Sequence, residues 1–277
     1  ILENKISKFV NCKYTVVCNS GTSALMMSLL SLKKRKITAI VPNINFVAII
    51  NILKFLNANI VISDVNDRGM TDYENFIKCL EFCKKKNLKP NVFLPIHYAG
   101  FILDLKKINE ICKKNNISII EDGCHSFGSI DSNKNYVGKS INSNMTTFSF
   151  HPVKNITTIE GGAVCTNNKN IYKKLCQIKS FDLKKTDLSD PYRAEGWGLN
   201  FRMGEVNAAL GIDQIKKVHK FKKKRIFIIK KYKECFADFH DHLEIINTYE
   251  KFFFWHLCVM KLKGELLKNK VKLMKYL

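Results

Sequence analysis

Short runs of β-branched and other apolar residues alternate with amphipathic segments along the first two thirds of the chain. The strand-like runs lie at 14–18, 37–41, 59–65, 91–96, 117–122, 146–150 and 162–167. Apolar residues recur at helical spacing at 23–32, 46–56, 73–85, 104–115 and from about 169 onward. Apolar strands separated by helices of about 10–15 residues are typical of βα units. We therefore predict an α/β fold, with a mostly parallel sheet and helices on both of its faces.

The last third of the chain follows a different pattern. A long helix with a Lys- and Arg-rich exposed side is expected from about 204 to 236, and the run FFFWHLCVMKL at 252–262 is strand-like. We predict a large α/β domain at 1–215, followed at 216–277 by a linking helix and part of a smaller α+β domain. Because the chain opens with Ile1 inside a helical pattern, we expect it to be a piece of a longer protein.

The charge of the chain raises the question of a polyanionic partner. Lys and Arg number 46 against 24 Asp and Glu, a formal net charge of +22. A nucleic-acid site would gather these cations in one patch, interleaved with aromatic residues that stack on bases. The lysine runs are instead spread from 33–36 to 222–224, on the expected solvent faces of helices. We therefore expect no nucleic-acid partner, and no apolar run is long enough to predict a membrane span.

The ten cysteines show no closely paired spacing of the kind found in small disulfide-rich domains. Cys79 and Cys83 lie four residues apart on an expected helix, but no second pair with the spacing of a metal site accompanies them. We interpret them as buried small hydrophobes and expect no metal site. Free thiols indicate a reducing compartment, and we expect the protein in the cytoplasm.

Ligands of such sheets bind at the carboxyl ends of strands, where loops lead into helices. The first of these loops reads CNSGTSAL, and Gly21 and Thr22 open the following helix. Free backbone N–H groups at a helix N-terminus form a phosphate cradle, although the same Ser-Gly-Thr sequence is also ordinary capping chemistry. The loop has neither a Walker lysine nor the GxGxxG spacing, which argues against a nucleotide P-loop and a dinucleotide site.

Another loop begins with Glu121 and Asp122, directly after a buried strand. An acidic side chain at such a position needs a cationic partner to offset its desolvation. A protonated ring nitrogen would suit Asp122, and a magnesium carboxylate or a helix N-cap would explain it equally well.

Lys154 lies in the stretch TTFSFHPVKNITTIEGG, which has neither helical nor strand periodicity. A single lysine in a loop is usually a solvated charge. Here it follows a candidate phosphate cradle and a strand-end aspartate, in that chain order. A pyridoxal phosphate site needs these parts: an anchored phosphate, a carboxylate that keeps the ring nitrogen protonated, and an amine that forms the Schiff base.

Several longer stretches extend this argument, in collinear order over nearly the whole chain. They are NSGTSAL (19–25), VPNINFVAIINIL (41–53), DV (64–65), LPIHYAG (94–100), IIEDGCHSFGS (119–129), TTFSFHPVKNITTIEGGAVCTN (146–167) and GLNFRMGEVNAALGIDQIKK (198–217). With them the sequence resembles the DegT/StrS-like family of pyridoxal-phosphate-dependent nucleotide-sugar aminotransferases. The resemblance implies the fold-type I architecture of that family, and further residues before Ile1 and after Leu277.

The resemblance also implies roles for residues around the cofactor ring. Lys154 is identified as the Schiff-base lysine and the general acid and base of the proton shift. Asp122 is identified as the partner of the pyridine nitrogen. His125 stands where the family places a Gln or His near the O3′ hydroxyl. Phe46 matches the aromatic residue that stacks on the ring face. Ordinary core packing is the alternative for Phe46 and His125.

The phosphate ligands implied by the resemblance are Gly21, Thr22 and Ser149. Asn200, in the segment LNFRM, matches an Asn that reaches the phosphate of a neighbouring subunit. A homodimer with shared active sites follows from that match.

The family chemistry comprises two half-reactions: L-glutamate supplies an amino group, which is then transferred to a 4-keto nucleotide sugar. The phrase SFHPVKNITT most resembles enzymes of the pseudaminic acid route, which aminate C4 of a UDP-linked 4-keto-6-deoxy sugar. Sugar dehydratases of the same fold carry His in place of the lysine, and a catalytically silent member would lack Lys154 or Asp122. A basic nucleic-acid-binding protein is the alternative from another class, and it would bind no chromophore.

Overall fold

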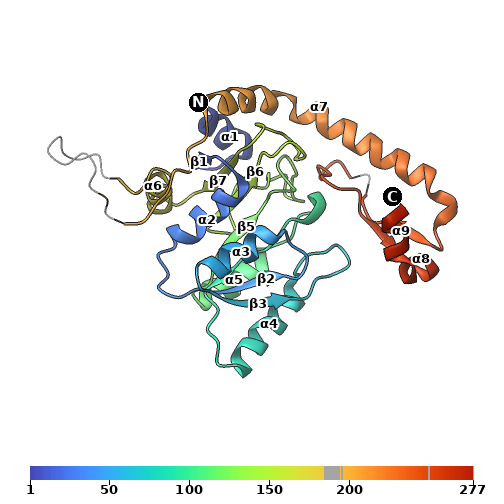
Figure 1. Cartoon of the computed structure of the whole chain (residues 1–277), viewed down its shortest axis with the longest axis horizontal. Helices are drawn as coiled ribbons and strands as arrows, with labels where there is room; N and C mark the ends of the chain where they lie inside the picture. The colour runs from blue at the N-terminus through green and yellow to red at the C-terminus, as the bar shows by residue number, and fades with distance from the viewer. Residues whose placement is uncertain (184–193, 195, 249, 277) are drawn as a thin grey trace.

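The structure, a computed structural model, describes residues 1–183, 194, 196–248 and 250–276, so that Leu277 at the end of the predicted second domain lies outside it. A seven-stranded sheet forms its centre (Figure 1). Its strands are β1 (Tyr14–Cys18), β2 (Thr38–Pro42), β3 (Asn59–Ser63), β4 (Val92–Phe93), β5 (Ser118–Asp122), β6 (Met145–Ser149) and β7 (Gly162–Thr166).

Helices flank the sheet and a smaller unit follows it. The helices of the main body are α1 (Leu2–Val10), α2 (Gly21–Ser31), α3 (Val47–Phe55), α4 (Tyr73–Lys85), α5 (Lys106–Lys114), α6 (Lys169–Ile178) and α7 (Glu205–Cys235). The C-terminal elements are β8 (Leu243–Ile245), β9 (Met260–Leu262), α8 (Gly264–Lys268) and α9 (Lys270–Tyr276). Figure 1 shows α7 running from the side of α1 across the molecule to the C-terminal elements.

Several helices begin where a polar side chain caps the first turn. Ser20 accepts a hydrogen bond from the Ser23 N–H at the start of α2, and Asp72 caps α4 through the Asn75 N–H. Asn168 caps α6 in the same way. These side chains replace the carbonyl partners that the first N–H groups of any helix lack.

The strands are ordered β1-β7-β6-β5-β4-β2-β3. β7 pairs antiparallel with β1 and with β6, and the remaining neighbours pair parallel. The predicted α/β class, with a mostly parallel sheet, is confirmed. The predicted division of the chain at 215–216 stays a prediction.

Alternating strand residues face two different helix layers, as the pleat requires. Ile120 and Val41 pack in the core that contains α2, α3 and α6. Their chain neighbours Ile119 and Ile40 pack in the core that contains α4 and α5. On that second face, α1 and α7 cover β6 and β7. Both faces are therefore buried, which explains the continuous apolar runs of the strands.

The expected strand at 252–262 is wrong over most of its length, since only Met260–Leu262 forms β9. Phe254 and Trp255 still point to different cores, as successive residues of an extended chain do. The backbone N–H groups, however, bond outside any strand ladder: that of Phe254 donates to Ser129 Oγ at 2.8 Å, and that of His256 to the Ala99 carbonyl at 2.8 Å. Before Met260, the segment pairs with no strand among the described residues.

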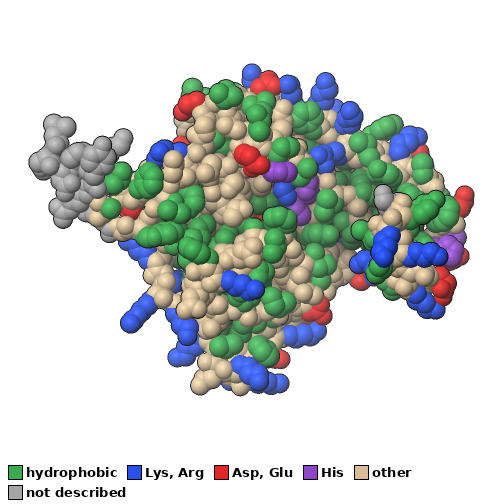
Figure 2. Space-filling model, in the orientation of Figure 1, with side chains coloured by type: hydrophobic (Ala, Val, Ile, Leu, Met, Phe, Trp, Pro, Cys, Tyr) green, Lys and Arg blue, Asp and Glu red, His purple; other side chains and the backbone are tan. Residues whose placement is uncertain are grey.

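Charged side chains are dispersed on the surface. On the face in Figure 2, Lys and Arg lie in separate groups over several elements, with Asp and Glu among them. Among the described residues, no helix has the length and apolar composition required to cross a bilayer. All ten cysteines are free thiols.

One buried carboxylate ties β5 to its surroundings. Glu121 Oε2 lies 2.7 Å from Nε2 of the fully buried His97. Because His97 Nδ1 accepts the Leu103 N–H at 3.1 Å, Nε2 carries the ring proton and donates to the carboxylate. Thr146 donates to Glu121 Oε1 at 2.9 Å, and Ser143 does so as well. Burial pushes the pKa of Glu121 upward, but these donors outweigh it and the pKa lies below its usual value.

We predict that His97→Ala destabilises the protein by about 3 kcal/mol at pH 7, because it leaves Glu121 ionised and short of a buried donor. A carboxyl whose folded pKa is depressed contributes stability above its unfolded pKa, and that contribution is lost as pH falls through the folded pKa. The penalty of the substitution should therefore shrink below about pH 4.5. Urea unfolding of both proteins from pH 7 down to about pH 3 measures this, and an equal penalty throughout would contradict it.

Candidate active site

The N-terminus of α2 forms one wall of the candidate site. The Ser23 N–H is capped by Ser20 Oγ at 3.0 Å, and Ser23 Oγ donates to Asn19 Oδ1 at 2.6 Å. The N–H groups of Gly21 and Thr22 have no carbonyl partner within the helix, as at the start of any helix. With the positive end of the helix dipole they form a place for an anion.

Gly21 packs directly against the end of β6. A methyl group at Gly21 would lie 2.6 Å from Ser149 Cβ and 3.0 Å from Ser149 Oγ, closer than side chains can approach. A methyl group at Gly162 would collide with the Ser20 carbonyl in the same way. The absence of side chains at these glycines is therefore what lets α2 meet β6 and β7, and it brings Ser149 to the helix terminus.

Asp122 lies at the carboxyl end of β5, on the same edge of the sheet. It is opposite Thr147 in the parallel register of β5 and β6, and Ser149 follows two residues later. Because strand residues alternate, Asp122 faces the α2 side while Glu121 is enclosed on the other side. Asp122 Oδ1 accepts the N–H of Cys124 at 3.0 Å. Burial, followed by the charge of Asp122, raises the pKa of the Cys124 thiol well above its usual value.

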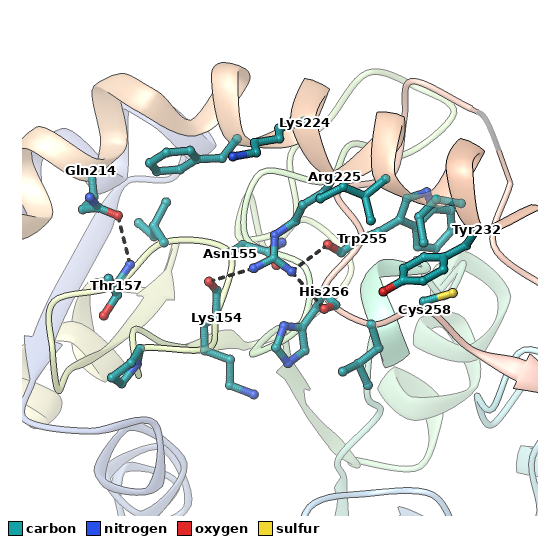
Figure 3. A pocket seen from close by; sticks show the side chains of 16 residues that line it. Lys154, Asn155, Thr157, Gln214, Lys224, Arg225, Tyr232, Trp255, His256 and Cys258 are labelled. Carbon is teal, nitrogen blue, oxygen red and sulfur yellow. Dashed lines mark hydrogen bonds between the residues drawn. The ribbon is translucent and has the colours of Figure 1, made fainter. Parts of the chain in front are cut away.

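Lys154 lies on a loop that closes on itself directly after β6. The Thr158 N–H donates to the Phe150 carbonyl at 2.9 Å, and the Lys154 N–H to the His151 carbonyl at 2.9 Å. The next residue, Asn155, is buried, and its side-chain amide fixes the loop by donating to the Phe127 carbonyl. The Lys154 side chain is half-buried and projects from this loop into the site (Figure 3).

Two imidazoles complete the site. The rings of His125 and His256 have centroids 4.4 Å apart and are inclined by 43°. His125 Nδ1 accepts the Ala99 N–H at 3.3 Å, so that Nε2 carries the proton of the neutral ring. His256 Nδ1 is buried and has no hydrogen-bond partner among the described residues. A buried polar atom without a partner is a place where a ligand donor fits.

Electrostatics confirms that these side chains share one space. Burial, then the charge of Lys154, then His256, lowers the pKa of His125 to about 2. Burial, then Lys154, then Arg225, lowers the pKa of His256 to about 3. Both imidazoles are therefore held in the neutral form, beside the Lys154 side chain.

The remaining predicted residues lie at the rim. Phe46 follows the carboxyl end of β2 as the residue before α3, and 69% of it is exposed. Thr22 is exposed on the first turn of α2. Asn200 is exposed, and its carbonyl accepts from Asn19 Nδ2 at 3.4 Å in the same chain. The structure thus brings Lys154, Asp122, His125, Gly21 and Ser149 to one edge of the sheet, and their roles stay predictions.

The sequence prediction missed His256, which came with no motif of its own. The apolar run that contains His256 predicts a strand and no ligand. The contact between His256 and His125 joins residues far apart in the chain, which no local pattern reveals. In the described part of the chain, no three or more His, Cys, Asp or Glu side chains are grouped so that they could hold a metal ion.

Comparison with known proteins agrees with this geometry. The profile of the DegT/DnrJ/EryC1/StrS aminotransferase family matches residues 1–277. The chain belongs to this family.

Relatives in this family carry named activities. A UDP-4-amino-4,6-dideoxy-N-acetyl-beta-L-altrosamine transaminase of Campylobacter jejuni is 33% identical over 253 residues, 90% of this chain and 65% of the relative. The Helicobacter pylori protein of the same name is 31% identical over 243 residues, 86% of this chain and 62% of the relative. The chain thus spans less than two thirds of the length of these curated relatives.

Solved structures of the family share the fold. Helicobacter pylori PseC, described as an aminotransferase involved in the biosynthesis of pseudoaminic acid, superposes with a TM-score of 0.86 at 26% identity, over 99% of this chain and 72% of PseC. An aminotransferase from Psychrobacter cryohalolentis gives 0.84 at 25% identity, over 95% of this chain and 69% of that one. The fold-type I architecture expected of this chain is confirmed.

We predict that Gly21→Ala weakens the binding of pyridoxal phosphate at least about tenfold, because the methyl group displaces α2 from Ser149 and misaligns the N–H groups at the helix terminus. Titration calorimetry with the cofactor and with inorganic phosphate measures it. Gly264→Ala is the control: it adds a methyl group with nothing within 4 Å at a φ of 50°, which costs stability without touching the site. Equal binding by the two variants would contradict the prediction.

A second prediction concerns His125. Its folded pKa lies below the value of 6.5 expected in the unfolded chain, so the stability it contributes is complete above pH 6.5 and is lost as pH falls below it. Between pH 7 and pH 5.5, the free energy of unfolding should fall by about 1 kcal/mol less in His125→Gln than in the wild-type protein. Denaturant unfolding at both pH values measures this, with the exposed His240→Gln as control. An unchanged pH dependence in His125→Gln would show that His125 titrates normally.

Proposed function

We propose that this protein is a pyridoxal-phosphate-dependent aminotransferase that moves an amino group from L-glutamate to C4 of a UDP-linked 4-keto-6-deoxy sugar. The observation that carries the proposal is the convergence of Lys154, Asp122 and the N-terminus of α2 at one edge of the sheet. These three features lie far apart in the chain, and the fold brings them together. Each matches a different part of one cofactor.

The side chains present fit pyridoxal phosphate. The close contact of Gly21 with Ser149 leaves backbone N–H groups and a hydroxyl directed at one place, which suits the phosphate. Asp122 offers a carboxylate to a protonated ring nitrogen, and it already accepts one N–H. Since His125 Nε2 carries a proton, it can donate to a ring hydroxyl. Lys154 supplies the amine that would hold the cofactor covalently.

The cofactor supplies an aldehyde that accepts and returns an amino group, on a ring that stabilises negative charge. The residues of this chain have separate tasks around it. Asp122 would keep the ring nitrogen protonated, and the first turn of α2 with Ser149 would hold the phosphate. Lys154 would move the proton at the reacting carbon, because it is the one amine in the group described above. The half-buried His125 and His256 would shield one side of the cofactor from water.

The relatives support the substrate. The Campylobacter jejuni and Helicobacter pylori transaminases that match this chain are named for a UDP-linked 4-amino-4,6-dideoxy sugar. Such a product is formed by amination of a UDP-linked 4-keto-6-deoxy precursor. L-glutamate as donor rests on the resemblance of the sequence to the family.

We further propose a homodimer in the cytoplasm. Large apolar side chains are exposed at the start of α3, on the lysine loop and in the first turn of α7, and a second copy would cover them. They are Phe46 at 69%, Val47 at 57%, Val153 at 58%, Ile159 at 57% and Val206 at 76% exposure. Patches of this kind on a folded protein mark interaction surfaces.

Ten free thiols favour a reducing compartment, which supports the cytoplasm as the location of the protein.

The visible absorption spectrum tests the proposal. Protein reconstituted with pyridoxal phosphate should show a visible band that bleaches when L-glutamate is added, as the cofactor takes up the amino group. Lys154→Ala should lack the protein-bound band, whereas Lys223→Ala, at an exposed position, should retain it. A band that glutamate leaves unchanged would favour a dehydratase-like or silent protein. Mass spectrometry of products from UDP- and GDP-linked 4-keto sugars then tests the substrate.

A further inference from the structure

The guanidinium of Arg225 joins two walls of the site without touching its reactive atoms. Arg225 lies on α7, and Nη1 donates to the carbonyls of Trp255 at 3.3 Å and His256 at 2.9 Å. Nη2 lies 3.5 Å from the carbonyls of Val153 and Lys154 (Figure 3). One side chain therefore bridges the loop that carries Lys154 and the segment that carries His256.

The chemistry of this bridge requires arginine. The hydrogen-bond partners that the structure gives Arg225 are backbone carbonyls from two separate segments. A guanidinium presents its N–H groups in a rigid planar fork, so that it can serve several acceptors in fixed directions. An ammonium is a point charge on a flexible stem and does not reproduce that geometry. Arg225 is half-buried, and this burial lowers its pKa.

The two joined segments have little secondary structure of their own. Among the described residues, the stretch from Phe252 to His256 has no strand partner. Side chains hold it in place together with backbone bonds to Ile130 and Ala99. Lys222 Nζ donates to the carbonyls of Gly128 at 3.3 Å and Phe252 at 3.1 Å. Asn155 Nδ2 donates to the carbonyls of Phe127 at 3.1 Å and Phe254 at 3.0 Å. Arg225 is the donor in this set that reaches the backbone of both Lys154 and His256.

We propose that Arg225 is a positioning residue for the active site: by bonding the carbonyls of Lys154 and His256, it holds the lysine loop and the histidine segment at a fixed separation. The inference rests on the function proposed above for Lys154. Arg225 acts through the backbone, because its guanidinium contacts the carbonyl of Lys154 and not the amine. Without it, the loop keeps its own turn and its hydrogen bonds to Asn207 and Gln214 of α7. The Lys154 carbonyl, however, loses its link to the histidine segment.

Displacement of a reacting group by about 1 Å costs up to a hundredfold in rate. Arg225→Gln and Arg225→Lys should therefore show at least a tenfold slower attachment of pyridoxal phosphate to Lys154. The measurement is stopped-flow absorbance of the bound cofactor, followed by borohydride reduction and mass spectrometry of the peptide that contains Lys154. Lys223→Gln removes a charge from the same helix at an exposed position and should behave as wild type.

Chemical rescue distinguishes the positioning role of Arg225 from a merely structural one. Arg225→Ala should regain attachment at Lys154 when methylguanidinium is added at millimolar concentration, while wild type and Lys223→Gln remain unchanged. Circular dichroism and the Tm show whether each variant is folded. If Arg225→Ala does not fold, Arg225→Lys, which keeps the charge and the aliphatic stem, decides the question by its attachment rate.

Attachment at the wild-type rate in Arg225→Lys, or in folded Arg225→Gln, would overturn the positioning role. Absence of cofactor attachment in the wild-type protein would instead overturn the proposed function. The two failures are distinguishable because the wild-type measurement contains no change at Arg225.

Discussion

Two consecutive carboxylates at the end of β5 face opposite sides of the sheet, and the site depends on that division. The pleat of the strand sends Glu121 into the interior, where His97, Ser143 and Thr146 hold it ionised. The same pleat sends Asp122 to the edge where α2 begins. Hydrogen bonds to Glu121 tie β5 to β6 and to the chain around His97. The buried carboxylate thus holds in place the strand end from which Asp122 projects.

Close backbone contact builds the other half of the site. Gly21 and Gly162 let the N-terminus of α2 approach the ends of β6 and β7, where a methyl group on either would collide. That approach brings Ser149 beside unbonded N–H groups and the positive end of a helix. An anion-binding place therefore arises from packing, before any basic side chain is added. On the face shown in Figure 2, the Lys and Arg side chains behind the net charge of +22 lie in separate groups and form no single basic patch.

Lys154 and His256 lie on segments that, among the described residues, belong to no strand. Side-chain donors help to hold these segments: Asn155 from within the lysine loop, and Lys222 and Arg225 from α7. Each bonds carbonyls that secondary structure leaves unbonded. The long helix consequently has two tasks. It leads to the C-terminal elements, and it sets the distance between the two walls of the site.

Local sequence patterns predicted the sheet and several of the candidate site residues of this protein. Alternating strands and helices predicted the sheet, because hydrophobic periodicity depends on a few neighbouring residues. Short motifs indicated Gly21, Asp122 and Lys154, since each lies in a loop whose chemistry is visible within about ten residues.

The tertiary structure was needed wherever the cause lay far along the chain. His256 meets His125, and Arg225 meets Lys154, across 131 and 71 residues. The run at 252–262 has the apolar composition of a buried strand, but a strand requires a partner strand. The fold offers Ser129 and Ala99 to its N–H groups instead. Composition and periodicity describe which residues will be buried. Which buried residues meet, and therefore which imidazoles and amines share one desolvated space, depends on how distant segments pack.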